Sequence, residues 1–284
     1  MRLAIAVAVL TAGSLALAKP PANRWEQLPD VPAMPEATEH GTVDAHGAKL
    51  YYARYGKPAT DAPVVILLHG GFGNSDHWAN QLPALVDKFA VLAIDSRGQG
   101  RSSHTKASLT YDLMAADVID VMDALHIPRA SIVGWSDGAE IALKLGIGHA
   151  DRVDRLFVFA ANYNEDGNKA GGNRSATFQE YGQRCRTEWE HLTPKPHDWQ
   201  AYVDGVMPLY RAPMGFTKDQ LRGIQAPVLV ADGDHDEVIQ LDQVTEMSKL
   251  IPHAKLVVFH DASHFALWQD PQAFNDALVG FLTN

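Results

Sequence analysis

The sequence predicts an α/β fold: a mostly parallel central sheet flanked by helices, with a small helical cap inserted into it. Short apolar runs rich in β-branched residues alternate with amphipathic stretches along most of the 284 residues. Continuous apolar runs of this kind are typical of strands buried on both faces of a parallel sheet. One polar interval without a clear strand, at about residues 162–225, is too long for a plain loop. We therefore expect one domain at residues 41–284, with the cap at about 162–225.

The predicted elements follow one another in a regular order. Residues 42–45 and 49–55 suggest a β-hairpin at the start of the domain. Further strands are predicted at residues 64–68, 90–94, 131–133, 156–160, 228–231 and 256–259. Helices are predicted from apolar residues near helical spacing at residues 76–88, 112–125, 138–145, 241–250 and 273–282.

Two segments precede this domain. Residues 1–18 contain one Arg, an interrupted apolar run and an Ala-Leu-Ala ending, which together predict a secretory signal peptide cleaved near Ala18. The apolar run is shorter than the roughly 20 residues that a membrane-spanning helix needs, so we expect no membrane anchor. Residues 19–40 are proline-rich and aperiodic, which predicts an extended arm or linker. We expect an exported protein, periplasmic or extracellular.

The composition excludes several classes of partner. The formal net charge is −10 and no Lys/Arg block occurs, which argues against nucleic-acid binding. Cys185 is the single cysteine, so the protein must be stabilised by its core rather than by disulfides, and we interpret this thiol as passive. The acidic run after residue 231 fails as a calcium loop because Glu237 stands where glycine is required. We expect no metal and no cofactor, and the oligomeric state stays open.

Candidate catalytic residues follow the strands, since ligands of open α/β sheets bind beyond the carboxyl ends of the strands. Ser136 lies in GWSDG, between a predicted strand and a predicted helix. Gly134 and Gly138 supply the small residues that such a sharp turn requires. A serine hydroxyl needs a base to become a nucleophile, and His264 follows the last predicted strand. We predict Ser136 as the nucleophile and His264 as its base.

The remaining parts of such a site are also present. A carboxylate between the serine and the histidine in chain order is supplied by the acidic run 232–237. Two backbone N–H groups could stabilise an oxyanion: that of Asp137, and one from the loop after residue 68, for which we predict Phe72. Gly71 and Trp135 are predicted substrate contacts. His69 is expected to brace the glycine loop rather than to titrate during catalysis.

Five motifs together resemble the α/β-hydrolase superfamily over about residues 42–284. They are HGGFG, DSRGQGRS, GWSDGA, DGDHDEVI and ASHFALWQDP. The resemblance implies a triad of Ser136, His264 and an acid three residues after Gly233, which favours Asp236 over Asp234. Some members take the acid from the loop after the preceding strand, so Glu165 and Asp166 remain alternatives. The resemblance also implies a helical cap.

A serine at this turn resembles the hydrolytic branches of the superfamily rather than the dehalogenases, which carry Asp there. We therefore expect a secreted hydrolase of a small-molecule carboxylic ester or related acyl bond, acting through an acyl-enzyme. Alternatives are an amidase, an aminopeptidase, a perhydrolase or a non-catalytic binding protein. The Asp137 side chain either repels anions and attracts amines, as the similar elbows of amino-acid-ester hydrolases hint, or merely favours the first turn of the helix.

Overall fold

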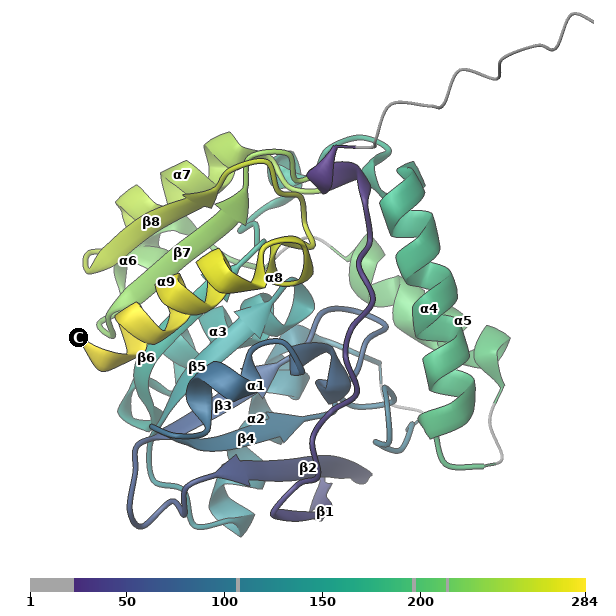
Figure 1. Ribbon diagram of the computed structural model, residues 1–284, viewed down its shortest axis with the longest axis vertical. Helices are drawn as coiled ribbons and strands as arrows, with labels where there is room; N and C mark the ends of the chain where they lie inside the picture. The colour runs from purple at the N-terminus through teal and green to yellow at the C-terminus, as the bar shows by residue number, and fades with distance from the viewer. Residues whose placement is uncertain (1–22, 106–107, 196–197, 213–214) are drawn as a thin grey trace, which may run out of the picture.

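A computed structural model describes residues 23–105, 108–195, 198–212 and 215–284. The predicted signal peptide and the first four residues of the arm lie outside this part of the chain. The described strands form one twisted sheet in the order β1-β2-β4-β3-β5-β6-β7-β8 (Figure 1). Strand β2 pairs antiparallel with β1 and β4, and the other neighbours pair parallel. The predicted fold class is confirmed.

The strands are β1 (Glu39–Ala45), β2 (Ala48–Gly56), β3 (Val64–Leu68), β4 (Ala90–Ile94), β5 (Ala130–Trp135), β6 (Val153–Phe159), β7 (Val228–Gly233) and β8 (Ala254–Phe259). Strands β3 to β7 are buried almost throughout, as their continuous apolar runs predict. Their carboxyl ends meet at one edge of the sheet, which places the residues that follow them close together.

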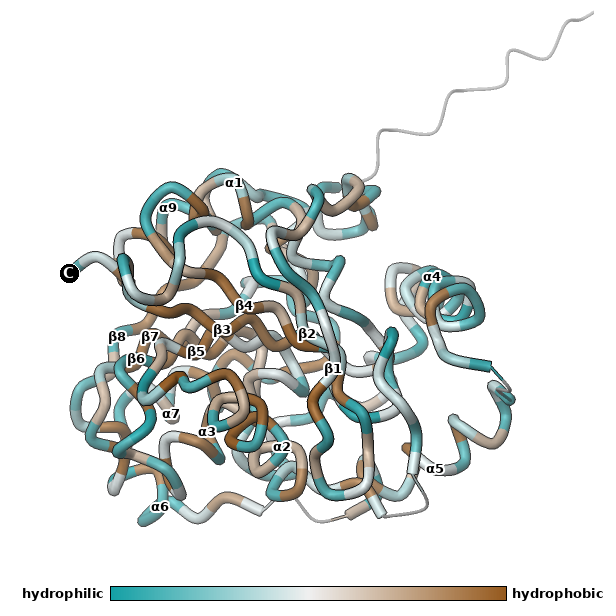
Figure 2. The backbone as a smooth tube through the Cα atoms, turned by 90° about the horizontal axis from the view of Figure 1, so that it is seen from below, coloured by the Kyte–Doolittle hydropathy of each residue, from teal (hydrophilic) through white to brown (hydrophobic). Residues whose placement is uncertain are grey.

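Helices cover both faces of the sheet (Figure 2). One face carries α1 (Leu82–Leu85), α8 (Ala266–Gln269) and α9 (Pro271–Thr283); the other carries α2 (Tyr111–Ala124), α3 (Asp137–Gly148), α6 (Lys218–Arg222) and α7 (Leu241–Leu250). Each face has its own buried apolar cluster. Helices α4 (Ala176–Leu192) and α5 (Trp199–Arg211) stand beyond one end of the sheet, where the sequence predicts the cap.

The single helix predicted at residues 76–88 is wrong. The segment forms a 3₁₀ helix at Ser75–Trp78 and the short helix α1, separated by a turn. Pro83 explains the break, because it has no N–H to donate to the carbonyl of Ala79 and is tolerated at the second position of the new helix. The apolar spacing continues across the turn, so this stretch of sequence has the pattern of one continuous helix.

The described part of the N-terminal arm begins with a 3₁₀ helix, Arg24–Glu26, and then runs without regular structure to β1. Arg24 donates hydrogen bonds to the Asp270 carboxylate at 2.7 Å and to the Asp261 carbonyl at 2.9 Å. Trp25 stacks on His235 with ring centroids 3.8 Å apart. Further along, Arg184 of α4 donates to the Pro29 carbonyl at 2.8 Å. The arm thus bridges the last helices of the domain and the cap.

Candidate active site

Ser136 occupies a sharp turn between β5 and α3. Its backbone φ is 53°, in the left-handed region that residues other than glycine rarely adopt. A Cβ atom on Gly134 would lie 2.2 Å from the Gly138 carbonyl oxygen. One on Gly138 would lie 2.1 Å from the Leu68 carbonyl oxygen. The requirement for small residues on both sides of Ser136, inferred from the sequence, is therefore a steric fact of this fold.

His264 and Asp236 come together because β7 and β8 are neighbours in the sheet. Nδ1 of His264 lies 2.7 Å from Oδ2 of Asp236, and both side chains are buried. The other carboxylate oxygen of Asp236 accepts the backbone N–H groups of Val238 at 2.6 Å and Ile239 at 2.7 Å. The carboxylate is therefore fixed on one side by backbone donors and fixes the imidazole on the other.

The two members of this pair shift each other's proton affinity. Burial lowers the pKa of His264, but the charge and hydrogen bond of Asp236 raise it, and the net shift is upward from 6.5. Burial raises the pKa of Asp236, but the charge of His264 and the hydrogen bonds to the carboxylate lower it, and the net shift is downward. Asp236 is thus kept ionised, and His264 is a stronger base than a solvated imidazole.

The other candidate acids lie elsewhere. Glu165 and Asp166 are exposed in a 3₁₀ helix, Glu165–Gly167, that follows β6. Asp234 pairs with His235 and His260 at 2.7 and 3.2 Å, outside the cavity that His264 lines. Asp236 is the candidate acid that the fold places against His264.

The loop after β3 holds Phe72 in an unusual conformation. The Gly73 N–H donates to the Gly70 carbonyl at 3.1 Å and closes a tight turn. Phe72 has a φ of 62°, a backbone region that costs a non-glycine residue about 1–3 kcal/mol. Within the described part of the chain, the N–H groups of Phe72 and Asp137 donate to no other protein group. Both are therefore available to an oxygen of a bound substrate.

A cavity of about 490 Å³ is lined by Ser136 and His264. Gly71 and Trp135, the predicted substrate contacts, line it as well. A Cβ atom on Gly71 would lie 2.2 Å from the Tyr210 hydroxyl, so a larger residue there would displace that side chain. Trp135 is buried, and its indole N–H donates to the His264 carbonyl at 3.0 Å. Many other lining side chains are aromatic or aliphatic: Phe72, Tyr111, Phe178, Tyr181, Met207, Leu209, Tyr210, Val238 and Ile239.

The Asp137 side chain belongs to this cavity. Its Oδ1 accepts the Tyr111 hydroxyl at 2.9 Å, and its Oδ2 accepts the Tyr210 hydroxyl at 2.7 Å. Burial raises the pKa of Asp137 and the two tyrosine hydroxyls lower it, with a net upward shift. The carboxyl group is 6% exposed and lines the cavity beside Ser136. The carboxyl group thus lies in the cavity wall as well as in the first turn of α3.

A second acid, Glu140, lies one turn further along α3 and lines the same cavity. Its Oε1 accepts the Asn162 N–H at 3.1 Å. Its Oε2 is buried and has no hydrogen-bond partner among the described residues. Burial raises the pKa of Glu140 well above its usual range. The neighbouring Asp137 charge adds to this upward shift, and the Asn162 N–H and the Lys144 charge oppose it.

Glu140 and the two tyrosines that bind Asp137 were not predicted from the sequence. Glu140 could have been predicted from its spacing, because a residue three positions after Asp137 lies on the same face of a helix. No local sequence pattern links Tyr111 and Tyr210 to the turn at Ser136, because they lie in α2 and in the cap.

His69 braces the glycine loop, as the sequence predicts. Its Nε2 accepts the Ser96 N–H at 3.0 Å, and its Nδ1 donates to the Gly70 carbonyl at 2.8 Å. Burial lowers the pKa of His69 to about 4, so this imidazole is neutral.

Two features are absent from the described residues. No group of three or more His, Cys, Asp or Glu side chains is arranged there to hold a metal ion. In the same ranges, no helix combines the length and the apolar character needed to cross a membrane.

Comparisons with known proteins agree with this geometry. A family model described as "Alpha/beta hydrolase family" matches residues 65–277. A protein of Caulobacter sp. (strain K31), provisionally named carbamate hydrolase RutD, is 30% identical over 267 residues, which cover 86% of this chain and 98% of that protein. The 3-oxoadipate enol-lactonase 2 of Acinetobacter baylyi is 30% identical over 84% of this chain and 94% of its own.

The fold is also similar to that of a solved enol-lactonase structure. The crystal structure of the enol-lactonase from Burkholderia xenovorans LB400 is similar with a TM-score of 0.71 and 26% identity, over 86% of this chain and all of the other. The family model covers most of the chain, and it includes the turn at Ser136 and the pair of His264 and Asp236. The chain therefore belongs to the alpha/beta hydrolase family and is a hydrolase.

Proposed function

We propose that the protein hydrolyses a carboxylic ester or a related acyl bond of a small molecule through a triad of Ser136, His264 and Asp236. The observation that carries the proposal is that Ser136, held at a φ of 53°, and His264, which is paired with the buried Asp236, line one cavity. A buried carboxylate that orients an imidazole beside a serine is the arrangement that acyl transfer requires.

The proposed mechanism uses only groups of this chain and water. His264 takes the Ser136 proton at Nε2 while Oγ attacks the substrate carbonyl carbon. The N–H groups of Phe72 and Asp137 bind the oxyanion of the tetrahedral intermediate. His264 returns the proton to the leaving oxygen, which leaves an acyl-Ser136 ester. A water molecule, deprotonated by His264, hydrolyses that ester and restores the enzyme.

The cavity suggests the size and polarity of the substrate. At about 490 Å³ it is within the usual range of small-molecule sites. Aromatic and aliphatic side chains favour an apolar acyl or alcohol group, whereas the Asp137 carboxylate disfavours a substrate carboxylate. The names of the relatives include a lactonase and a carbamate hydrolase, whose bonds are acyl bonds of the proposed kind. We propose an uncharged ester or lactone as the first substrate class.

Asp137 supports a second candidate, an ester or amide whose acyl part carries an amine. Its carboxyl group is held by Tyr111 and Tyr210 at the cavity wall, next to Ser136. A pair of esters that differ only by an α-amino group would separate the two candidates. Preference for the amine that disappears in D137N would support the second, and equal or lower activity toward the amine would support the first.

The proposal is tested with p-nitrophenyl acetate and the variant S136A. The wild-type protein should release p-nitrophenol, and S136A should lose this activity while retaining the circular dichroism spectrum of the wild type. A folded S136A protein with the wild-type rate would exclude Ser136 as the nucleophile. A panel of esters, lactones, amides and peptides would then define the acyl bond.

We also propose export to the periplasm or the extracellular space. The support is the signal-peptide pattern of residues 1–18, followed by a cleavage motif at Ala18. The N-terminal residue of the protein isolated from its native host tests this directly. A mature protein that begins near Lys19 would support export, and an intact N-terminus in the cytoplasmic fraction would contradict it.

A further inference from the structure

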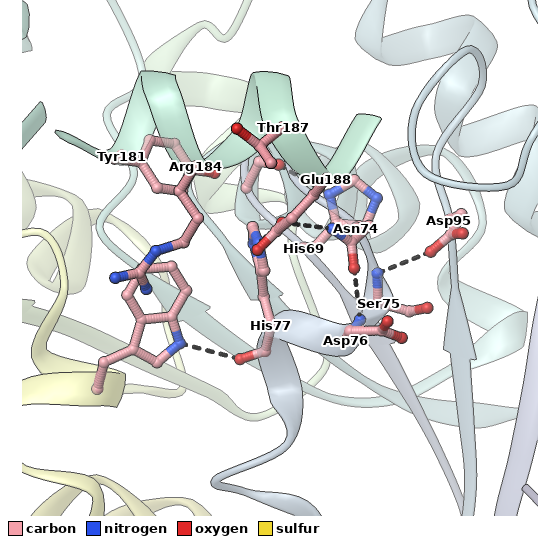
Figure 3. Close-up of polar contacts among 12 residues, drawn as sticks. His69, Asn74, Ser75, Asp76, His77, Asp95, Tyr181, Arg184, Thr187 and Glu188 are labelled. Carbon is pink, nitrogen blue, oxygen red and sulfur yellow. Dashed lines mark hydrogen bonds and ion pairs between the residues drawn. The ribbon is translucent and has the colours of Figure 1, made fainter. Parts of the chain in front are cut away.

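The loop that carries Phe72 is bound from outside by the cap. Figure 3 shows Glu188, on helix α4, directed at Asn74 and His77, which follow this loop in the chain. One carboxylate oxygen of Glu188 accepts both the Asn74 amide at 2.8 Å and Nε2 of His77 at 2.7 Å. Asn74 and His77 are almost fully buried, whereas the Glu188 side chain is 30% exposed.

Electrostatics favour an ionised Glu188 in this position. Burial raises the pKa of Glu188, but the hydrogen bonds from His77 and Asn74 and the charge of Arg184 lower it, and the net shift is downward. Because a carboxylate can only accept a hydrogen bond, Nε2 of His77 must be the donor and carries the imidazole proton. Nδ1 of His77 is then left without a hydrogen-bond partner among the described residues.

His77 links Glu188 to the loop because its imidazole packs against the Gly73 backbone. A Cβ atom on Gly73 would lie 2.7 Å from Nδ1 of His77, so the imidazole edge sits directly against the Gly73 backbone. The His77 carbonyl is fixed in turn by the Trp268 indole N–H at 3.0 Å. The imidazole therefore cannot shift without moving either the loop or the core beneath it.

A second group of the same helix acts on the loop directly. The Tyr181 hydroxyl donates to the Gly71 carbonyl at 2.8 Å. Gly71 immediately precedes Phe72, so this bond orients the peptide group that contains the Phe72 N–H. From α5, Tyr202 and Tyr210 pack on the Phe72 ring with centroids 5.6 and 5.8 Å away. The strained φ of 62° at Phe72 is thus held from several sides.

We propose that Glu188 is a positioning residue for catalysis: through His77 and Asn74 it holds the oxyanion loop, residues 70–73, in the conformation that aims the Phe72 N–H at the reacting oxygen. This inference rests on the proposed function, because it assigns a consequence to the oxyanion hole. Glu188 is not among the described residues that line the cavity of Ser136, so it acts through other residues. Its effect is exerted in the transition state, where the oxyanion is formed.

The test compares E188A with E190A in hydrolysis of p-nitrophenyl acetate. Glu190 is an exposed residue of the same helix that pairs only with Arg186 among the described residues, so E190A controls for general effects on α4. In E188A we expect kcat to fall about tenfold or more with little change in KM, because a displaced donor weakens transition-state binding selectively. E190A should match the wild type, and E188Q, which keeps an acceptor oxygen, should lie between the two.

A second readout separates positioning from stability. An alkyl trifluoromethyl ketone forms a hemiketal whose oxyanion would occupy the proposed hole, so its inhibition constant should rise in E188A in parallel with the loss of kcat. The affinity for the corresponding alcohol, which has no oxyanion, should stay the same. If E188A does not fold, E188Q replaces it: this variant keeps the size of the side chain and removes only its charge, and the same two shifts, smaller in size, are expected.

The outcomes are distinct. Wild-type kcat and ketone inhibition in E188A, or in E188Q where E188A does not fold, with only a lowered Tm, would overturn the positioning role and leave the triad intact. Absence of hydrolysis and of ketone inhibition in the wild type itself would instead overturn the proposed function and this inference with it.

Discussion

Nδ1 of His264 lies 2.7 Å from Oδ2 of Asp236, although 28 residues separate them in the chain. The contact exists because β7 and β8 are parallel neighbours, and Asp236 and His264 lie in the loops that follow them at the same edge of the sheet. The backbone N–H groups of Val238 and Ile239 hold the other oxygen of the carboxylate. The acid is therefore fixed before any substrate binds, and it determines the tautomer of the imidazole.

Replacing this acid should cost most of the activity. In D236N we expect kcat to fall by about 10⁴, because an amide no longer selects the imidazole tautomer that accepts a proton at Nε2. The measurement is steady-state hydrolysis of p-nitrophenyl acetate. D234N is the matched control: Asp234 pairs with His235 and His260 away from the cavity, so its activity should stay near that of the wild type. A severe loss of activity in D234N with a mild loss in D236N would show that Asp234, and not Asp236, is the acid of the triad.

The pH dependence of kcat/KM should report His264. Only the neutral imidazole can take the serine proton, so activity should rise as the pH increases through the pKa of His264. Since Asp236 and nearby carboxylates shift this pKa upward, the midpoint should lie above 6.5. In D137N one of these carboxylates is lost, and the midpoint should move to lower pH. A wild-type midpoint below 6.5, or an upward shift in D137N, would contradict this electrostatic account.

The sequence was sufficient for the parts of the site that depend on chain order and local sterics. The turn at Ser136 could be predicted because Gly134 and Gly138 are required by contacts within the strand–turn–helix unit itself. The position of His264 could be predicted because the loop after the last strand must end at the ligand edge of a parallel sheet. The choice of Asp236 over Asp234 needed the family resemblance, since both lie in one acidic run.

Other features depend on contacts that no local pattern encodes. Tyr111, Tyr181 and Tyr210 reach the site from α2 and the cap, and the path of the cap across the sheet is set by packing. The break between Ser75–Trp78 and α1 was hidden because its apolar spacing continues across the turn. Glu188 and His77 are more than 100 residues apart, and the pair becomes visible only when α4 is placed over the loop.

The glycines at the turn provide a test of the fold itself. G134A should lower the free energy of unfolding by about 1–3 kcal/mol or more, because the new methyl group would collide with the Gly138 backbone. In G280A, within α9, no atom lies within 4 Å of the added Cβ. That control should gain about 0.4–1 kcal/mol. Urea denaturation measures both, and equal stabilities would refute the steric argument.

Cys185 should behave as an inert thiol. It is fully buried in α4, and burial raises its pKa well above the usual range. Iodoacetamide should therefore leave the native protein unmodified and fully active, and should alkylate it readily in denaturant. Mass spectrometry of the intact protein gives the extent of reaction. Rapid alkylation of the native protein would show that α4 opens far more readily than its packing indicates.

The central claim is that Ser136 is a nucleophile activated by His264, and active-site labelling tests it most directly. The native protein is incubated with a fluorophosphonate, digested, and the modified peptide is sequenced by mass spectrometry. The account predicts a single phosphonate adduct on Ser136, strongly reduced labelling in D236N and none in S136A. An unlabelled wild-type protein, or an adduct on any other residue that persists in S136A, would contradict it.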